Sequence, residues 1–298
     1  MIKNPARSGI SPHIPIMVKE VIQYLQVYKT GTYVDCTIGY GGHARHILER
    51  LSLSGNLIGI DKDEQAIQFC KKSLSAYSNI QLFHNSYHRV KDILSISKAK
   101  KVDGMLLDLG LSSAQLDSKS RGFSYKINSE LDMRFDLSQK FKANDILNTK
   151  SKKEIADVIF KYSDERRSRT IAENILKMRP IKNVYELVEA IRKSTPPKNR
   201  KKSLSRVFQA IRILVNDELN ILEKFLSEFY SQLSIGGRIV FISFHSIEDR
   251  IVKHALKNLS FKKKIKILTK KPIRPSQEEN SSNQRSRSAK LRAAEKIS

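Results

Sequence analysis

Short apolar runs alternate with amphipathic segments over the first 110 residues. The apolar runs around Val34 and at 56–61, 80–85 and 102–110 predict four strands, and the segment 63–74 has the spacing of a helix. The run at 102–110 is continuously apolar, which is typical of a strand buried on both faces. Strands that alternate with helices predict an α/β fold with a doubly wound, parallel sheet.

The alternation stops between Gln115 and Arg206, where the chain is polar, basic and mostly helical in pattern. Residues 205–233 then predict one long helix, and 236–246 predict another buried strand. The last residues, 281–298, look like a tail in composition, but their end alternates enough for a final strand. We therefore expect a discontinuous sheet domain, 1–114 and 207–298, that carries an inserted helical domain, 115–206.

The charge of the chain points to a polyanionic partner. The 298 residues carry a formal net charge of +25, far more than solubility requires, and nucleic acid is the commonest partner of such a protein. The basic residues concentrate in four separate segments, which fits a long backbone footprint: 164–169, 196–206, 261–271 and 283–292. The alternative is a lysine-rich surface that is merely solvated.

Composition also limits the class of protein. Hydrophobic residues make up 40% of the chain, enough for a real core, but no run is long enough to span a membrane and residues 1–17 contain no signal-peptide stretch. Cys36 and Cys70 have no metal-ligand spacing. We expect a soluble, cytoplasmic protein without a metal site, and the sequence predicts no oligomeric state.

The stretch "VDCTIGYGGHARHIL", residues 34–48, predicts a strand, a tight turn and a helix. Gly39, Gly41 and Gly42 remove side chains where the backbone must bend sharply or approach a ligand. Free N–H groups at such a turn can hold a nucleotide-like ligand. A packing role, in which the glycines only permit the turn, is the alternative.

Nicotinamide cofactors, flavins and S-adenosyl-L-methionine (AdoMet) all bind at glycine turns of this kind. The dinucleotide spacing G-x-G-x-x-G is absent. Asp35 precedes the glycines, where it would repel a pyrophosphate but attract a cationic amino group. Asp61, at the end of the second strand, is placed to accept hydrogen bonds from ribose hydroxyls. These acids favour AdoMet over a dinucleotide.

Two further polar residues follow predicted strands. Asp108 ends the fourth strand, at the edge where open parallel sheets bind ligands, although a loop acid that only caps nearby N–H groups would look the same. His245 ends the strand at 236–246 and is a candidate for substrate contact. Ser246 and Asp249 have the types and spacing of a capping pair for the next helix.

Several segments together resemble the MraW (RsmH) family, bacterial methyltransferases that methylate N4 of a cytidine in 16S ribosomal RNA. The matching stretches run in family order over nearly the whole chain, and the most specific are "DGMLLDLGLSSAQLD", "RGFSYKINSELDMRFD" and "GGRIVFISFHSIEDRIVK". The resemblance implies a class I AdoMet-dependent methyltransferase fold with a helical insertion that recognises the substrate. It also implies 16S rRNA, in the small ribosomal subunit, as the partner. The cofactor-binding positions that it implies are Gly41, Gly42, His43, Asp61, Tyr87, Asp108 and Gln115.

The chain departs from the family pattern at three positions. Tyr87 stands where phenylalanine is usual, which keeps an aromatic face for adenine. Cys36 replaces a usual glycine and Ala44 a usual serine, and both are small enough for binding to persist.

The chemistry implied is an in-line displacement at a sulfonium centre, which needs positioning more than a metal. The lone pair of a cytosine amino group is conjugated into its ring, so a carboxylate that accepts its hydrogens would help. Asp108 is the candidate, ionised at pH 7 if its pKa is near the reference value of about 3.9. The target base must be unpaired or flipped out of a helix.

Three other functions stay open at this stage. A non-enzymatic RNA-binding or assembly protein would explain the charge but not the glycine turn with its acids. A nicotinamide oxidoreductase is disfavoured by Asp35 and the glycine spacing. A DNA amino-methyltransferase would use the same chemistry on another nucleic acid.

Overall fold

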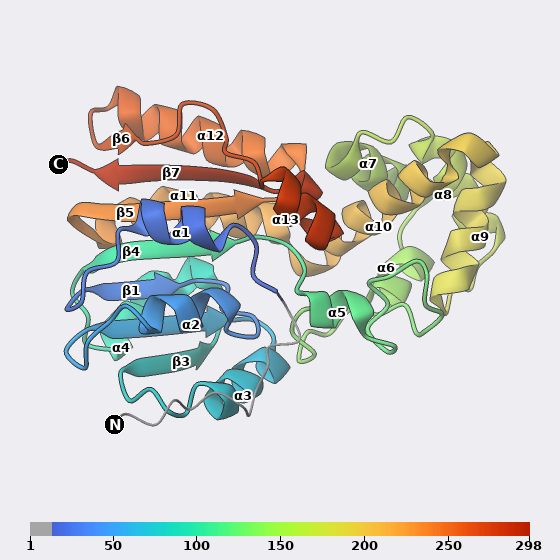
Figure 1. The fold of residues 1–298 in the computed structure, drawn as a ribbon. Coiled ribbons are helices and arrows are strands. Elements are labelled where there is room, and N and C mark those ends of the chain that lie inside the picture. The colour runs from blue at the N-terminus through green and yellow to red at the C-terminus, as the bar shows by residue number, and fades with distance from the viewer. Residues whose placement is uncertain (1–13) are drawn as a thin grey trace. The chain divides into compact units, whose positions relative to one another are not determined.

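The computed structural model describes residues 14–298. The segment 1–13, where the predicted sheet domain begins and no signal peptide is expected, lies outside the described residues. A seven-stranded sheet has the order β3-β2-β1-β4-β5-β7-β6, in which β7 alone runs antiparallel to its neighbours β5 and β6 (Figure 1). The strands are β1 (Thr32–Asp35), β2 (Asn56–Asp61), β3 (Ile80–His84), β4 (Val102–Asp108), β5 (Leu233–Ser243), β6 (Ile265–Ile267) and β7 (Lys290–Lys296). The predicted parallel sheet and the predicted last strand are confirmed.

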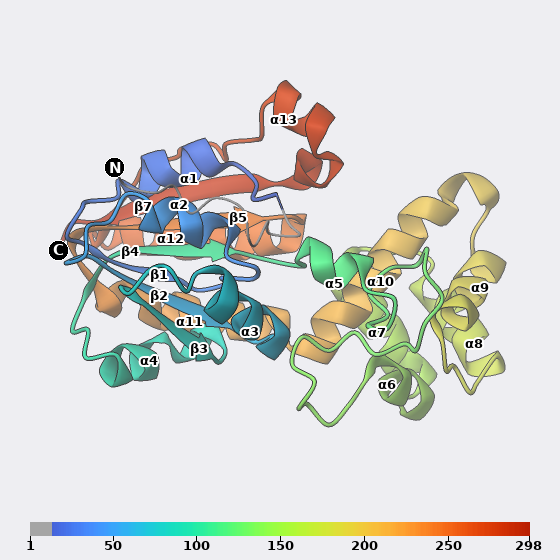
Figure 2. The same cartoon turned by 60° about the horizontal axis from the view of Figure 1, so that its bottom comes forward.

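Helices cover both faces of the sheet, as a doubly wound fold requires (Figures 1 and 2). One face packs against α1, α2 and α3, and the other against α4, α11 and α12. These helices are α1 (Val18–Leu25), α2 (Gly42–Leu48), α3 (Glu64–Ser73), α4 (Val90–Ile96), α11 (Glu218–Gln232) and α12 (Ser246–Phe261). Short elements complete this part: η1 (Tyr87–Arg89), α13 (Gln277–Ser282) and η3 (Gln284–Ser288).

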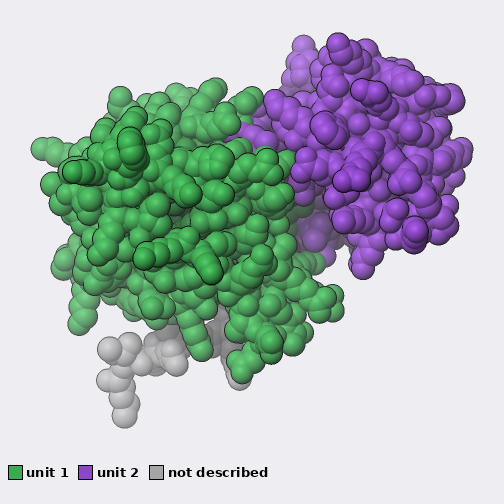
Figure 3. Space-filling model, turned by 90° about the horizontal axis from the view of Figure 1, so that it is seen from above, with its two compact units in different colours: residues 1–112, 220–298 green, residues 113–219 purple. Residues whose placement is uncertain are grey.

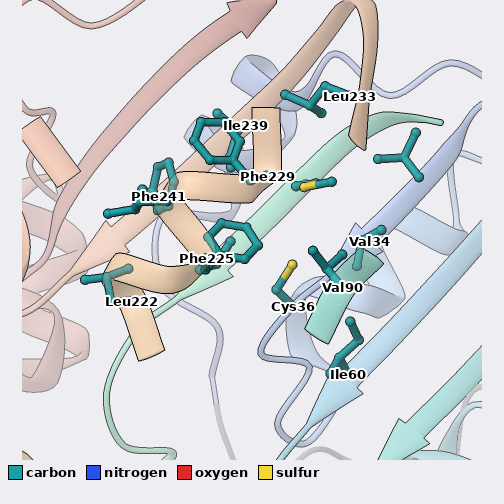
Figure 4. Close-up of a cluster of buried hydrophobic side chains, with 14 of the residues drawn as sticks. Val34, Cys36, Ile60, Val90, Leu222, Phe225, Phe229, Leu233, Ile239 and Phe241 are labelled. Atoms are coloured by element: carbon teal, nitrogen blue, oxygen red, sulfur yellow. The ribbon is translucent and has the colours of Figure 1, made fainter. Parts of the chain in front are cut away.

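The continuous apolar runs of the inner strands supply two cores at once. Successive side chains of a strand point to opposite faces, so in β4 Met105 and Leu107 join one core while Leu106 joins the other. Phe225 and Phe229 of α11 stack at 5.7 Å within the first of these cores (Figure 4). Because the sheet is buried on both faces, it holds the residues at the carboxyl ends of its strands in fixed positions.

Contacts within the chain divide it into two compact units (Figure 3). Unit 1 consists of the described residues up to Ser112 together with Asn220–Ser298 and contains the sheet; unit 2 is Ser113–Leu219. The boundaries expected from the sequence are 114/115 and 206/207. The division into a methyltransferase domain and an inserted substrate-recognition domain stays a prediction.

Unit 2 is helical, and its helices are amphipathic. Buried apolar residues recur one turn apart, as at Ile155 and Ile159, or Ile171 and Ile175. The elements are α5 (Ser113–Asp117), α6 (Ala143–Thr149), α7 (Lys152–Ser163), α8 (Ser168–Lys177), α9 (Val184–Ser194), η2 (Pro197–Asn199) and α10 (Arg200–Asn216).

The prediction of one long helix over 205–233 is wrong. Asp217 adopts a left-handed conformation, with a φ of 53°, and ends α10 before α11 begins. Its N–H donates to the carbonyls of Ile213 and Leu214, which satisfies the last turn of α10. Apolar periodicity continues across this break, so the pattern alone could not show it.

In residues 14–298 no helix is both long and apolar enough to cross a membrane.

Candidate functional site at the carboxyl edge of the sheet

The predicted glycine turn lies between β1 and α2. Gly39 and Gly41 have φ values of 51° and 76°, a conformation that side-chain-bearing residues rarely adopt. Gly41 is the N-cap of α2, and Gly42 is its first residue. A Cβ on Gly39 would find no neighbour closer than 3.9 Å, whereas one on Gly42 would meet Pro15 at 3.0 Å. The turn therefore has open space at Gly39 and tight packing at Gly42.

Asp61 holds this turn in place from the end of β2. Its two carboxylate oxygens accept hydrogen bonds from Gly39 N at 2.7 Å and from Asp63 N at 2.8 Å. Burial raises the pKa of Asp61 to about 6 even though both hydrogen bonds lower it. Each carboxylate oxygen can accept a second hydrogen bond, so Asp61 can receive one from a ligand hydroxyl beside Gly39.

Asp35 ends β1 and is almost fully buried. Burial raises its pKa to about 7; the hydrogen bond from Thr37 N lowers the pKa, and the nearby Asp61 raises it further. No lysine or arginine of the described chain pairs with either carboxyl. A cationic ligand that bound at the carboxyl edge of the sheet could therefore pair with Asp35 and Asp61.

Asp108 ends β4, next to β1 in the sheet. Burial first, and then the charges of Asp35 and Glu248, raise its pKa well above the ordinary value. The condition under which Asp108 would be ionised at pH 7, a pKa near 3.9, therefore does not hold in the ligand-free protein. Its Oδ1 is buried and has no hydrogen-bond partner within the described chain.

His43 faces Asp108 from the first turn of α2. Its Nε2 lies 2.8 Å from the carbonyl oxygen of Ile16, which can only accept, so Nε2 carries a hydrogen. In the neutral ring Nδ1 then presents a lone pair to Asp108 Oδ2, 3.7 Å away. Two lone pairs repel each other, which agrees with the preference of Asp108 for its protonated form.

Tyr87 and Gln115 lie on other elements. Tyr87 begins η1, after β3, and its ring packs edge-on against Phe225 at 5.5 Å. This contact fixes the ring while leaving the residue only partly buried. Gln115 is buried in α5 of unit 2. The structure thus brings Gly41, His43 and Asp108 together in unit 1, and the role of Gln115 stays a prediction.

The predicted capping pair Ser246 and Asp249 is wrong. His245 is the N-cap of α12: its Nδ1 accepts from Glu248 N, and the Glu248 carboxylate accepts from the backbone N–H of His245. Asp249 instead receives the Arg292 guanidinium at 2.6 Å. Histidine is an unusual cap, so the preference for serine at this position favoured the wrong residue. The H-x-x-E spacing was the signal that could have identified Glu248.

The sheet order, with an antiparallel strand inserted between β5 and β6, and the acid-lined glycine turn define an α/β methyltransferase of class I. Within that class the chain belongs to the MraW methylase family, whose model matches residues 10–297. The fold, the enzyme class and the family expected from the sequence are confirmed.

Relatives in three bacteria carry the same name, ribosomal RNA small subunit methyltransferase H. The protein of Thermosipho africanus is 47% identical over 96% of this chain and 98% of its own length. That of Thermotoga neapolitana is 47% identical over 96% of each chain, and that of Caldicellulosiruptor saccharolyticus is 45% identical over 96% of this chain and 99% of its own.

Proposed function

We propose that the protein transfers a methyl group from AdoMet to N4 of a cytidine in 16S rRNA of the small ribosomal subunit, in the cytoplasm. The observation that carries the proposal is a set of three acids near the glycine turn, Asp35, Asp61 and Asp108, whose pKa values are raised by burial and which have no lysine or arginine partner within the described chain. Membership of a methylase family and the names of the relatives support it.

The residues present fit AdoMet. Asp61 would accept hydrogen bonds from the ribose hydroxyls beside the open face of Gly39. Tyr87 would offer its ring to the adenine. The two positive charges of AdoMet, on its amino group and its sulfonium, suit the uncompensated carboxyls of Asp35 and Asp108. Gly41, Gly42 and His43 would present the start of α2 to the methionine carboxylate.

Asp108 is the proposed acceptor for the target amine. Its unpartnered Oδ1 would accept a hydrogen bond from N4 and so increase the electron density on that nitrogen. When bound, the cofactor supplies an electrophilic methyl group and a positive charge that favours the ionised form of Asp108. Asp108 would accept the N4 proton that methylation displaces, so that the methylated amine is left neutral.

Unit 2 would bind the RNA. Arg166 and Arg169 are exposed in the segment between α7 and α8 and at the start of α8, and Arg167 is partly exposed between them. Positive side chains in such a segment suit the phosphate backbone.

The test is methyl transfer from labelled AdoMet to small subunits isolated from cells that lack this protein, followed by mass mapping of the modified nucleotide. One N4-methylated cytidine in 16S rRNA is the expected product, and Asp61→Ala should weaken AdoMet binding. A protein that binds the subunits but transfers no methyl group would be an assembly factor. Transfer to DNA in place of rRNA would identify the DNA amino-methyltransferase.

A further inference from the structure

Two buried polar atoms at neighbouring strand ends have no hydrogen-bond partner within the described residues. They are Oδ1 of Asp108 and Nε2 of His245. β4 and β5 are parallel neighbours, with Asp108 opposite Ile242 and Leu109 N donating to Ile242 O. His245 follows Ile242 by three residues, so both side chains belong to the carboxyl edge of the sheet. Buried polar groups are nearly always paired in native proteins, so two unpaired ones at one edge indicate a missing ligand.

The capping contact fixes which nitrogen of His245 carries the hydrogen. Nδ1 accepts the hydrogen bond from Glu248 N at 3.3 Å, so in the neutral ring the hydrogen is on Nε2. Glu248 Oε1 lies 3.0 Å from Nε2, but it is out of line for a hydrogen bond. The other oxygen of Glu248 accepts from Phe244 N and His245 N. His245 therefore holds a buried N–H donor that makes no hydrogen bond to its nearest acid.

A donor from His245 and an acceptor from Asp108 match the Watson–Crick edge of cytosine, or of the larger adenine, and mismatch that of uracil or guanine. Cytosine presents an N4–H donor beside the N3 acceptor, whereas uracil presents the opposite order, an O4 acceptor beside an N3–H donor. A site with buried donors and acceptors rejects a ligand that leaves them unpaired far more strongly than an apolar pocket does.

We propose that His245 is a recognition residue for the target base: its Nε2–H donates to N3 of the cytosine while Asp108 Oδ1 accepts from N4. The inference rests on the proposed function and assigns the residue that selects the base. A hydrogen bond at N3 also makes the N4 hydrogens more acidic, which assists their transfer to Asp108. His245 thereby orients N4 and distinguishes cytidine from uridine.

Two variants, His245→Ser and His245→Ala, distinguish the role of His245 as a helix cap from its role in base recognition. Serine is a good N-cap but has no donor that reaches as far as Nε2, whereas alanine removes the cap as well. We expect His245→Ser to keep the melting temperature and, within about twofold, the AdoMet dissociation constant, and to lower kcat/KM for small subunits at least tenfold. Ser151→Ala, which removes the cap of α7, is the matched control: it should lower the melting temperature and leave kcat/KM unchanged.

Three outcomes of this comparison would overturn the proposal. Full activity in His245→Ser with a loss only in His245→Ala would show that His245 acts as a cap alone. A rise in the AdoMet dissociation constant as large as the loss of kcat/KM would place His245 on the cofactor. An unchanged kcat/KM in both variants would show that His245 has no role in methyl transfer.

A chemical cycle tests the contact at N3 directly. Small subunits are reconstituted with 16S rRNA that carries 3-deazacytidine, which lacks the N3 acceptor, at the methylated position. The deaza substitution and His245→Ser should each lower kcat/KM, and together they should lower it no further than the larger single loss. Multiplying losses would overturn the contact. Because the cycle is measured only once wild-type protein methylates ordinary cytidine, failure of the proposed function would be visible first.

Discussion

Acidic side chains in the two units of the molecule have opposite environments. In unit 1, Asp35 and Asp108 have no lysine or arginine partner within the described residues, and burial raises their pKa values. In unit 2, Glu154 accepts from Lys150 and from Ser151, and Glu173 pairs with Lys152 and Lys177; hydrogen bonds from these partners lower the pKa of each glutamate to about 2.

The direction of the pKa shift distinguishes acids that stabilise the fold from acids that are available to bind a ligand. An acid whose pKa is lowered by a neighbouring lysine already has its counter-charge in the folded chain. A buried acid without one destabilises the ligand-free protein when it ionises, and natural sequences keep such a cost mainly where function requires it. Asp249, paired with Arg292 in unit 1, shows that this contrast follows the function of the residue more than the unit in which it lies.

The largest effect is expected at Asp108. Asp108→Asn keeps the size of the side chain but removes its ability to take a proton, so kcat should fall by about 10³-fold. Single-turnover methyl transfer measures this loss, and equilibrium dialysis should show an AdoMet dissociation constant that changes much less. Equal losses in turnover and in affinity would make Asp108 a cofactor ligand only.

The next largest effect is expected on stability, at Asp35. Its folded pKa of about 7 lies above the unfolded value of 3.8, so the folded state binds the proton more tightly. The resulting stabilisation is complete below pH 4 and is lost as the pH rises to 7. Asp35→Asn should therefore raise the free energy of unfolding of the ligand-free protein at pH 8 by about 3 to 4 kcal/mol, and leave it unchanged near pH 4.

Urea unfolding followed by circular dichroism measures the effect of Asp35→Asn, since the chain contains no tryptophan. The same variant should bind AdoMet about tenfold more weakly at pH 8, because it lacks the charge that faces the amino group. A variant that is both less stable and equally competent in binding would place Asp35 among the structural acids, and the contrast between the two units would fail there.

The sequence was sufficient to predict six of the seven strands, the turn and the positions of the acids, because each depends on local pattern; the three-residue strand β6 was too short to be predicted. Apolar runs predicted strands such as β2, and the acids that end β1, β2 and β4, with the glycines after β1, located the carboxyl edge of the sheet. The protonation of Asp108 could not be predicted, because it depends on burial and on Asp35 and Glu248, which are distant in sequence.

Two local features were predicted wrongly for physical reasons. The break at Asp217 interrupts an apolar pattern that is helical on both sides, and an aspartate in the left-handed conformation gives little warning in sequence. The cap of α12 was assigned to Ser246 from general preferences, whereas the backbone places His245 there. A functional demand on the Nε2 hydrogen of His245 would explain why this position departs from the usual cap.

A smaller effect is expected on RNA binding by the arginines of unit 2. Replacing Arg166, Arg167 and Arg169 by glutamine should weaken binding to 16S rRNA about tenfold at physiological salt and reduce the slope of log K against log salt by about 2. Filter binding across a salt series measures both quantities. The control variant loses the same charge from exposed positions elsewhere in the unit, because glutamine replaces Lys153, Arg192 and Lys193. Equal changes in the two variants would mean that net charge, and no particular surface, attracts the RNA.

The smallest effect is expected from the paired glutamates of unit 2. Their pKa values of about 2 lie below the unfolded value of 4.5, so their stabilisation is present above pH 4.5 and is lost as the pH falls toward 2. Glu154→Gln with Glu173→Gln should lower the melting temperature slightly at pH 7, and less in 1 M salt, because exposed ion pairs are screened. Methyl transfer should not change. Scanning calorimetry at the two salt concentrations measures the shift. A rise in melting temperature, the direction expected of Asp35→Asn, would mean that acids in both units destabilise the ligand-free fold.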